Sequence, residues 1–224
     1  MKEIKLVKRL KKIGLALALM LYPLFAGFAF AVHPNLSSLQ IDTPIADKIA
    51  EFHNNTQLHN GHLFMLAGVP LLIIIAVHFM RLLENRSAWW GLIGGILAVS
   101  GAIILAVDKA ALCLVPSALD TLSEIQYQAM IPGITAMFAG KGGLWVLHLL
   151  PILPVGFVLL SIGLLRAKAL PLQISIPILI GSLLMANPDI DLIGLIATSF
   201  LALGFFQYAI CLFRTDGTTL MNEV

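Results

Sequence analysis

The chain has 224 residues, of which 59% are hydrophobic and only 12% are charged, and its mean hydropathy is +0.94. A soluble domain usually carries about 25% charged residues. This composition excludes an ordinary soluble globular protein and predicts an integral membrane protein. The formal net charge of +2 gives no reason to expect a nucleic-acid partner. The expected partner is the lipid bilayer, with other membrane subunits as a further possibility.

The first candidate span is an apolar run from Ile13 to Val32, which follows a strongly basic start. Residues 1–12 contain six lysines and arginines, which are expected to form a cytoplasmic tail facing anionic lipid. Two interpretations are open for the run. Its length of about 20 residues favours a retained span, because the apolar part of a signal peptide usually has about 7–15 residues. Alternatively, Ala29-Phe30-Ala31 resembles a cleavage site, and cleavage would leave five spans.

Five further apolar runs follow, and each is long enough to be predicted as a transmembrane helix. They cover approximately His62–Leu83, Trp89–Leu114, Leu144–Leu165, Leu170–Ala186 and Ile190–Phe213. Two longer connections, residues 33–61 and 116–143, separate some of these runs. Each connection is expected to carry a short surface helix. One begins at Thr43-Pro44 and ends near Asn54, and the other covers about Ser117–Ala129 and is interrupted by Pro132-Gly133.

The distribution of charge predicts the orientation of the spans. Basic residues gather at alternate connections, whereas the two long connections are mainly acidic. Because basic residues concentrate on the cytoplasmic side, both termini are expected inside and both long connections outside. The predicted fold is therefore all-α: a polytopic membrane bundle of about six helices, forming a single domain over residues 1–224. The basic residues on the cytoplasmic side are the N-terminal cluster, Arg81, Arg86, Arg166, Lys168 and Arg214.

Ionisable residues of several spans are expected at one level, close to the outer membrane boundary. Counting about 1.5 Å per residue from the cytoplasmic basic residues gives the same depth for each of them. Charged groups at this depth usually face a bundle interior or a partner. The alternative is an interfacial latch whose lysine reaches to the lipid headgroups. The residues of this outer polar layer are His62, Asp108, Lys109, His148 and Asp189.

The adjacent pair Asp108 and Lys109 is expected to find partners on other helices. Neighbouring positions of a helix point about 100° apart, so the two side chains are not expected to face each other. The candidate partners are His62 or His148 for Asp108, and Asp189 or Asp191 for Lys109.

Two cofactor sites are conceivable in this layer. His59, His62 and His148 could bind a divalent metal, because imidazoles three residues apart on a helix share a face. His62 and His148 could instead ligate haem b from two helices. The simpler interpretation is that these are polar histidines of loops and helix ends. Cys113 and Cys211 are expected at opposite membrane faces, as small apolar side chains that do not pair.

Two stretches carry a resemblance to a known group of proteins. Gly163-Leu-Leu-Arg-Ala-Lys-Ala-Leu-Pro171, followed by Ile178–Gly181, resembles a helical hairpin of uncharacterised polytopic bacterial inner-membrane proteins. Gly61-His62-Leu-Phe-Met-Leu is similar to the start of a span in the same group. The resemblance implies a compact helical bundle in a bacterial inner membrane, and it implies no activity and no catalytic residue.

The sequence favours a non-enzymatic protein, a subunit or accessory component of a membrane assembly. It contains no GxSxG motif, Walker loop or dinucleotide fingerprint. Below the outer layer the spans offer few polar residues, which argues against an ion path through the bundle. Two alternatives remain: a small-molecule or ion transporter with a polar site on the extracytoplasmic side, and a haem or metal redox protein using His62 and His148.

Overall fold

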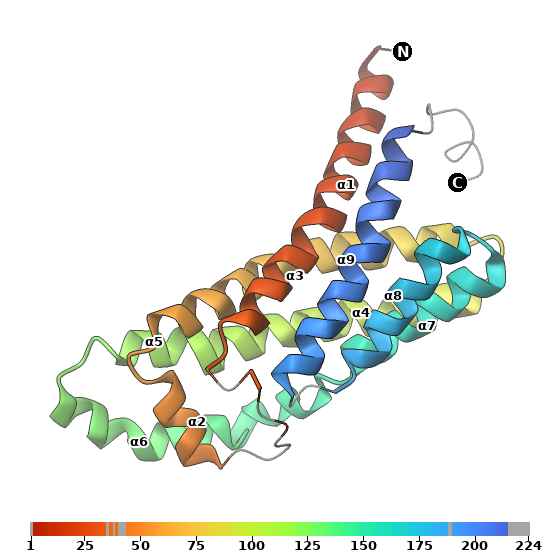
Figure 1. Ribbon diagram of the computed structural model, residues 1–224. Coiled ribbons are helices and arrows are strands. Elements are labelled where there is room, and N and C mark those ends of the chain that lie inside the picture. The colour runs from red at the N-terminus through yellow and green to blue at the C-terminus, as the bar shows by residue number, and fades with distance from the viewer. Residues whose placement is uncertain (1, 35, 38, 40–43, 188–189, 215–224) are drawn as a thin grey trace.

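A computed structural model describes residues 2–34, 36–37, 39, 44–187 and 190–214. The described residues form helices joined by turns, with no β-strand among them. The predicted all-α bundle is confirmed. Figure 1 shows the start of α1 (Lys2–Ala31) and the end of α9 (Asp191–Arg214) on one side of the molecule. The short helices α2 (Ile45–Phe52) and α6 (Glu124–Phe138) lie on the opposite side.

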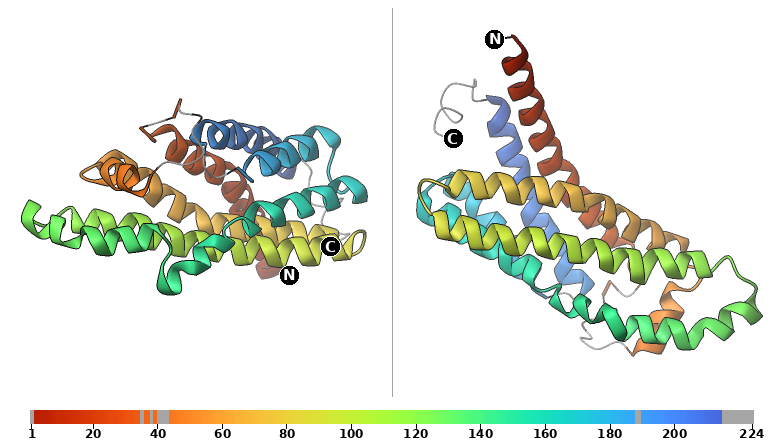
Figure 2. Two further views of the ribbon diagram at one scale, coloured as in Figure 1. Left: turned by 90° about the horizontal axis from the view of Figure 1, so that it is seen from below. Right: turned by 180° about the vertical axis from the view of Figure 1, so that it is seen from behind.

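Six apolar helices form a closed ring. Each packs against the next in chain order, and the last packs against the first. The ring therefore has an inside, which holds most of the buried core, and an outside covered with exposed leucine, isoleucine and phenylalanine side chains. Figures 1 and 2 show the arrangement of these helices. In ring order they are α1 (Lys2–Ala31), α3 (Thr56–Leu83), α4 (Ala88–Lys109), α7 (Ile152–Ala167), α8 (Leu172–Leu184) and α9 (Asp191–Arg214).

The length of these helices agrees with a membrane protein that crosses the bilayer several times. Five helical stretches of the described chain are long and apolar enough to cross, and they contain α1, α3, α4, α7 and α9. The predicted fifth span, Leu170–Ala186, is shorter than expected. Its helix α8 has 13 residues and rises about 20 Å, less than the roughly 30 Å of hydrocarbon in a bilayer. The chain is a multi-pass integral membrane protein in which α8 completes the ring.

Glycine residues allow neighbouring helices of the ring to touch backbone to backbone. A Cβ atom on Gly156 of α7 would overlap the backbone of Ala98 on α4. A Cβ atom on Gly101 of α4 would lie 2.5 Å from the Cα atom of Leu153 on α7. Gly204 of α9 approaches the carbonyl oxygen of Ile174 on α8 in the same way. Small residues at such contacts are typical of membrane helices, which gain little from burying apolar surface against each other.

Three short helices and two irregular segments form a cap at the end of the bundle opposite the start of α1 and the end of α9. This end is called here the polar end. The helices are α2 (Ile45–Phe52), α5 (Val115–Leu119) and α6 (Glu124–Phe138), and α2 packs against α6 around a small core of its own. The irregular segments are a π-helix at Ala110–Leu114, directly after α4, and a 3-10 helix at Gly142–Leu149, shortly before α7.

The cap agrees with the predicted surface helices in part. The first, expected from Thr43-Pro44 to Asn54, is α2, whose N-cap is Pro44; Thr43 lies outside the described residues. The second prediction was wrong in its bounds. The helix of the third span continues through the π-helix into α5, and a separate helix α6 begins after the capping box at Ser123. Pro132 lies inside α6 instead of interrupting it.

Replacing Gly156 with alanine should destabilise the protein by about 1–3 kcal/mol, because the added methyl group would have to push α7 away from Ala98 on α4. Gly14 is the matched control, since a Cβ atom there meets nothing within 4 Å. Gly14→Ala should leave stability unchanged or raise it slightly, because alanine favours a helix more than glycine does. Unfolding of both variants in detergent measures the difference. Equal stabilities would contradict the close contact between α4 and α7.

The orientation of the bundle is tested by reporters on either side of it. A reporter fused after Val224 should be active only in the cytoplasm, because the basic residues lie at that end of the ring. A reporter inserted in the turn at residues 120–123, between α5 and α6, should be active only outside. If both reporters respond on the same side, the three crossings expected between them, by α7, α8 and α9, are wrong.

Candidate functional site

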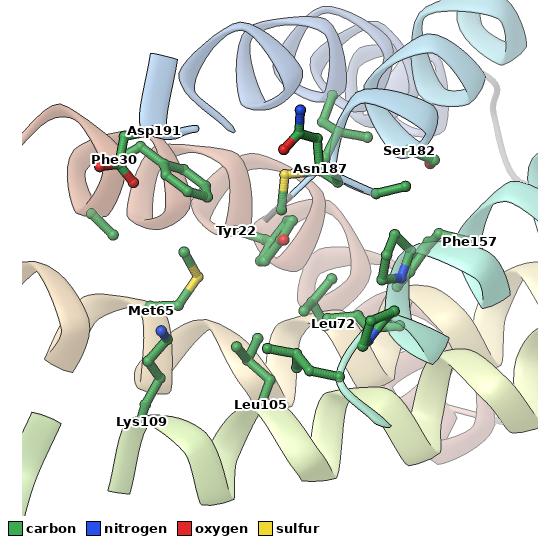
Figure 3. Close-up of a pocket in the computed structure, with 18 of the residues that line it drawn as sticks. Tyr22, Phe30, Met65, Leu72, Leu105, Lys109, Phe157, Ser182, Asn187 and Asp191 are labelled. Atoms are coloured by element: carbon green, nitrogen blue, oxygen red, sulfur yellow. The ribbon is translucent and has the colours of Figure 1, made fainter. Parts of the chain in front are cut away.

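The inside of the ring contains a cavity of about 480 Å³ near the polar end. All six ring helices or their adjoining segments contribute to its wall, as Figure 3 shows for 18 of the lining residues. A volume of this size lies within the usual range for small-molecule sites, which runs from about 300 to 1,000 Å³.

The wall of the cavity changes character with depth. Most of the polar side chains of the wall lie at the polar end, beside apolar ones such as Phe30. They are His33, His62, Lys109, His148, Asn187 and Asp191. The deeper wall is mainly apolar and includes Leu72, Phe157, Leu201 and Phe205. Asp191 and Phe205 are 14 residues apart on α9, which corresponds to about 21 Å along the helix axis. The cavity is therefore an elongated chamber with a polar mouth.

Four side chains at the mouth form a continuous chain of hydrogen bonds. His33 Nδ1 lies 3.0 Å from Asp191 Oδ2, His33 Nε2 lies 3.1 Å from His62 Nε2, and His62 Nδ1 lies 2.8 Å from Cys113 Sγ. An ionised carboxylate can only accept, so His33 donates from Nδ1 to Asp191. When the ring of His33 is neutral, its Nε2 accepts. It follows that His62 donates from Nε2 and accepts the thiol hydrogen of Cys113 at Nδ1. The carboxylate thus sets the tautomer of both histidines.

The sequence reasoning missed two members of this chain, His33 and Cys113. His33 follows the end of α1 and appeared to be a loop residue, and Cys113 was expected to be a small apolar side chain. The π-helix at Ala110–Leu114 accompanies the placement of Cys113 against His62. Such insertions in a helix are frequent at functional sites, but nothing in the residue pattern marks one here.

Asp108 and Lys109 pair with each other, contrary to the prediction that each would need a partner on another helix. Lys109 Nζ lies 2.8 Å from Asp108 Oδ2, and Asp108 is 7% exposed. The prediction treated the two side chains as short rods pointing 100° apart, whereas the four methylene groups of lysine let its ammonium group turn back. Lys109 lines the cavity. Asp108 does not line it and contacts the site through its ion pair with Lys109.

Tyr22 places a hydroxyl group part of the way down the cavity. Its side chain is 3% exposed and packs over Gly68 of α3, about 9 Å along the helix from His62. Figure 3 shows it near the middle of the cavity. The hydroxyl has no hydrogen-bond partner among the described residues. Because Tyr22 lines the cavity, this hydroxyl is available to a bound molecule.

A second polar cluster lies in the cap, outside the lining of the cavity. Asp120 accepts hydrogen bonds from His53 Nδ1 at 2.9 Å, from His59 Nε2 at 2.8 Å and from the backbone N–H of Asn54 at 3.0 Å. The ring of His53 also stacks on Tyr127 of α6 with 3.8 Å between ring centroids. These contacts join the start of α3 to α5 and α6, so their evident role is to hold the cap together.

Electrostatics link α2 to the mouth of the cavity as well. Partial burial raises the pKa of the Glu51 carboxyl above its usual value, and the nearby carboxylates of Asp191 and Asp47 raise it further, whereas His33 and Lys48 act in the opposite direction. Phe52, the next residue on α2, packs its ring 5.2 Å from the ring of His62. The cap therefore contacts the site directly.

The cavity ends in tightly packed side chains on the side of the termini. Phe205, the deepest lining residue on α9, packs its ring against that of Phe79 with 6.2 Å between centroids. Both side chains are fully buried. His78 accepts or donates a hydrogen bond of 2.6 Å to the Tyr208 hydroxyl one turn further on. An aromatic layer and one hydrogen-bonded pair therefore follow the cavity at this depth.

The structure does not assemble the predicted metal site. His59 is bonded to Asp120, His62 to Cys113 and His33, and His148 donates from Nδ1 to the carbonyl oxygen of Trp145. Within the described part of the chain, no group of three or more histidine, cysteine, aspartate or glutamate side chains is arranged to hold a metal ion.

The predicted haem pair has a related difficulty. His62 and His148 do line one cavity, but both ring nitrogens of His62 are engaged. Ligation of iron would require His62 to give up one of these hydrogen bonds. Of the remaining predicted site residues, Lys109 lines the cavity, Asp108 is bonded to Lys109, and Asp189 lies outside the described residues.

Comparison with known proteins adds no relative. No protein-family model matches the chain, and no curated protein and no solved structure matches it either. The site must therefore be interpreted from its own chemistry.

Replacing Asp108 with asparagine should reduce the free energy of unfolding by about 1–3 kcal/mol, because Lys109 would keep its charge without its buried counter-ion. Asp47→Asn is the control, since Asp47 is exposed on α2. The double variant Asp108→Asn with Lys109→Met should recover part of the loss. Equal losses for Asp108→Asn and Asp47→Asn in detergent unfolding would show that the ion pair does not stabilise the bundle.

Proposed function

We propose that the protein binds a small, mainly apolar molecule inside its helix ring and acts as a membrane carrier or receptor for it. The observation that carries this proposal is the cavity itself, which is elongated, apolar in its depth and polar at its mouth. A few polar groups in a mainly apolar, concave wall are the usual features of a small-molecule site.

The chemistry of the wall supports binding better than catalysis. The imidazole nitrogens of His33 and His62 are used within their own hydrogen-bond chain, and the charge of Lys109 is paired with Asp108. The Cys113 thiol is 1% exposed and does not line the cavity. A group that attacks or protonates a substrate must reach it within hydrogen-bonding distance.

This function corresponds to the second hypothesis from the sequence, a small-molecule transporter with a polar site on the extracytoplasmic side. It is compatible with the first, a non-enzymatic subunit of a membrane assembly, because a binding subunit needs the same kind of cavity. The blind end formed by Phe79 and Phe205 supports a binding site over an open ion channel. The proposed location is a bacterial inner membrane, with the mouth outside.

The proposal is tested with a photoreactive hydrocarbon that has no head group, added to liposomes containing the protein. Crosslinks located by mass spectrometry should appear at Leu72 and Phe205, which line the cavity and are buried from lipid, as well as on the outer face. Leu105→Trp should lower these internal crosslinks about tenfold, because the larger ring fills the space beside Leu72.

Ile103→Trp is the matched control, because Ile103 lies on the same helix and is 55% exposed on the outside of the ring. It should leave the crosslinks at Leu72 and Phe205 unchanged. Crosslinks confined to the outer face in the unmodified protein, or an equal effect of both tryptophans, would overturn the proposed binding site.

A further inference from the structure

Asp108 and Asp191 differ in how their negative charges are compensated. Asp108 is paired with Lys109, whose ammonium group lies 2.8 Å away. Asp191 is paired with the ring of His33 at 3.0 Å, and a neutral ring donates a hydrogen bond without bringing a charge. In the described lining of the cavity, Lys109 is the only lysine or arginine and Asp191 the only aspartate or glutamate. When His33 is neutral, the carboxylate of Asp191 therefore gives the mouth a net negative charge.

Asp191 is placed to present this charge to a bound molecule. It is the first residue of α9, where the helix dipole stabilises a carboxylate. His33 engages only Oδ2, and Oδ1 has no hydrogen-bond partner among the described residues. Lys109 belongs to α4, which lies across the ring from α9, and Figure 3 shows Asp191 and Lys109 on opposite sides of the cavity. The carboxylate of Asp191 is therefore separated from the ion pair on α4.

An aromatic ring lies beside this carboxylate. Phe30 of α1 lines the cavity and packs its ring over Gly194, one turn along α9 from Asp191. The centroid of the Phe30 ring is 6.5 Å from that of His33, and Figure 3 shows Phe30 and Asp191 next to each other. The face of an aromatic ring attracts ammonium groups, and a carboxylate pairs with them. The two side chains together are suited to a positively charged ammonium group.

Carboxyl groups of α2 add to the negative charge on this side of the mouth. Burial raises the pKa of the Glu51 carboxyl, and the carboxylates of Asp191 and Asp47 raise it further, so the three groups lie near one another. Lys48 and His33 act in the opposite direction. A positive head group that enters between α2 and α9 therefore meets more negative than positive charge among the described residues.

The rest of the cavity indicates an organic cation instead of a metal ion. Within the described residues, no group of three or more histidine, cysteine, aspartate or glutamate side chains is arranged to hold a metal, whereas hard cations require about six oxygen ligands. The deep wall around Leu72 and Phe205 is apolar and suits a hydrocarbon chain. An anionic head group would be repelled by Asp191, and an uncharged one would leave its charge uncompensated.

These features define a class of ligand. We infer that the cavity binds a single-chain amphiphile with a monovalent ammonium head group, whose charge is compensated by the Asp191 carboxylate beside the ring of Phe30. This inference rests on the proposed binding function and specifies its ligand. The head group lies at the polar mouth, and the chain extends into the apolar depth toward Phe205.

The test uses three photoreactive probes that share one 16-carbon chain with a mid-chain diazirine. Their head groups are a trimethylammonium group, a methyl ester and a carboxylate. The protein is placed in liposomes of zwitterionic lipid at about pH 8.5, where histidine side chains in proteins are generally neutral. Crosslinks at Leu72 and Phe205 are divided by crosslinks at the exposed Ile103, which corrects for different partition into lipid. The trimethylammonium probe should exceed both others by about tenfold or more, because its charge alone is opposite to that of Asp191.

Asp191→Asn keeps an oxygen that can accept the hydrogen bond from His33 and removes the charge. It should reduce the internal crosslinks of the trimethylammonium probe about tenfold, and it should leave those of the head-group-free hydrocarbon unchanged, which checks that the cavity is retained. Glu124→Gln is the matched control, because it removes one negative charge from an exposed side chain of the cap that does not line the cavity. It should leave the crosslinks of both probes unchanged.

The outcomes separate the two proposals. If no probe crosslinks inside the ring, including the hydrocarbon, the binding function fails. If the hydrocarbon crosslinks inside but the ester or the carboxylate equals or exceeds the trimethylammonium probe, the binding function stands and the inferred ligand class is wrong. Equal effects of Asp191→Asn and Glu124→Gln on the trimethylammonium probe would overturn the role given to Asp191. If Asp191→Asn also loses the hydrocarbon crosslinks, the comparison of the three head groups in the unmodified protein decides the ligand class.

Discussion

Close contact between helix backbones is the constraint on which the rest of this structure depends. In a bilayer, apolar side chains gain little by leaving lipid for protein, so helices associate where their backbones can approach closely. Gly156 and Gly101 provide this approach between α4 and α7, and Gly204 provides it between α8 and α9. The ring closes through these contacts even though α8 is short. A closed ring of six helices then has an interior that is shielded from lipid, and the cavity occupies part of it.

Irregular backbone gathers around the mouth of this cavity. The π-helix at Ala110–Leu114 follows Lys109, the 3-10 helix at Gly142–Leu149 carries His148, and α8 ends at Leu184, so that Asn187 reaches the wall. Non-helical backbone at membrane depth is tolerated only where protein covers it or a cavity adjoins it. The early end of α8 therefore contributes to the site, because it lets the segment that carries Asn187 line the cavity.

The sequence predicted depth along the helices far better than direction around them. Hydropathy and the basic residues were enough to place the spans, and counting residues put His62 and Lys109 at one level, where both now line one cavity. The rotation of each helix about its own axis depends on its packing contacts with other helices, and these contacts cannot be read from one sequence. For this reason the pairing of Lys109 with Asp108 was not expected, and the thiol of Cys113 was not connected with His62. His33 lies in a loop after α1, and the path of a loop cannot be predicted from a helical repeat of apolar residues.

The site also constrains how a bound molecule can leave. The hydrogen bond between His78 and Tyr208 and the packed rings of Phe79 and Phe205 close the deep end, so release toward the termini would require all four side chains to move. The mouth, by contrast, is bordered by the cap, which Asp120 holds through hydrogen bonds to side chains and one backbone N–H. Breaking a few hydrogen bonds beside water costs less than separating a packed aromatic layer inside a bundle, because water replaces the lost partners. Exchange through the polar end is therefore the route of lower cost, and complete passage across the membrane would need a second arrangement of α3 and α9.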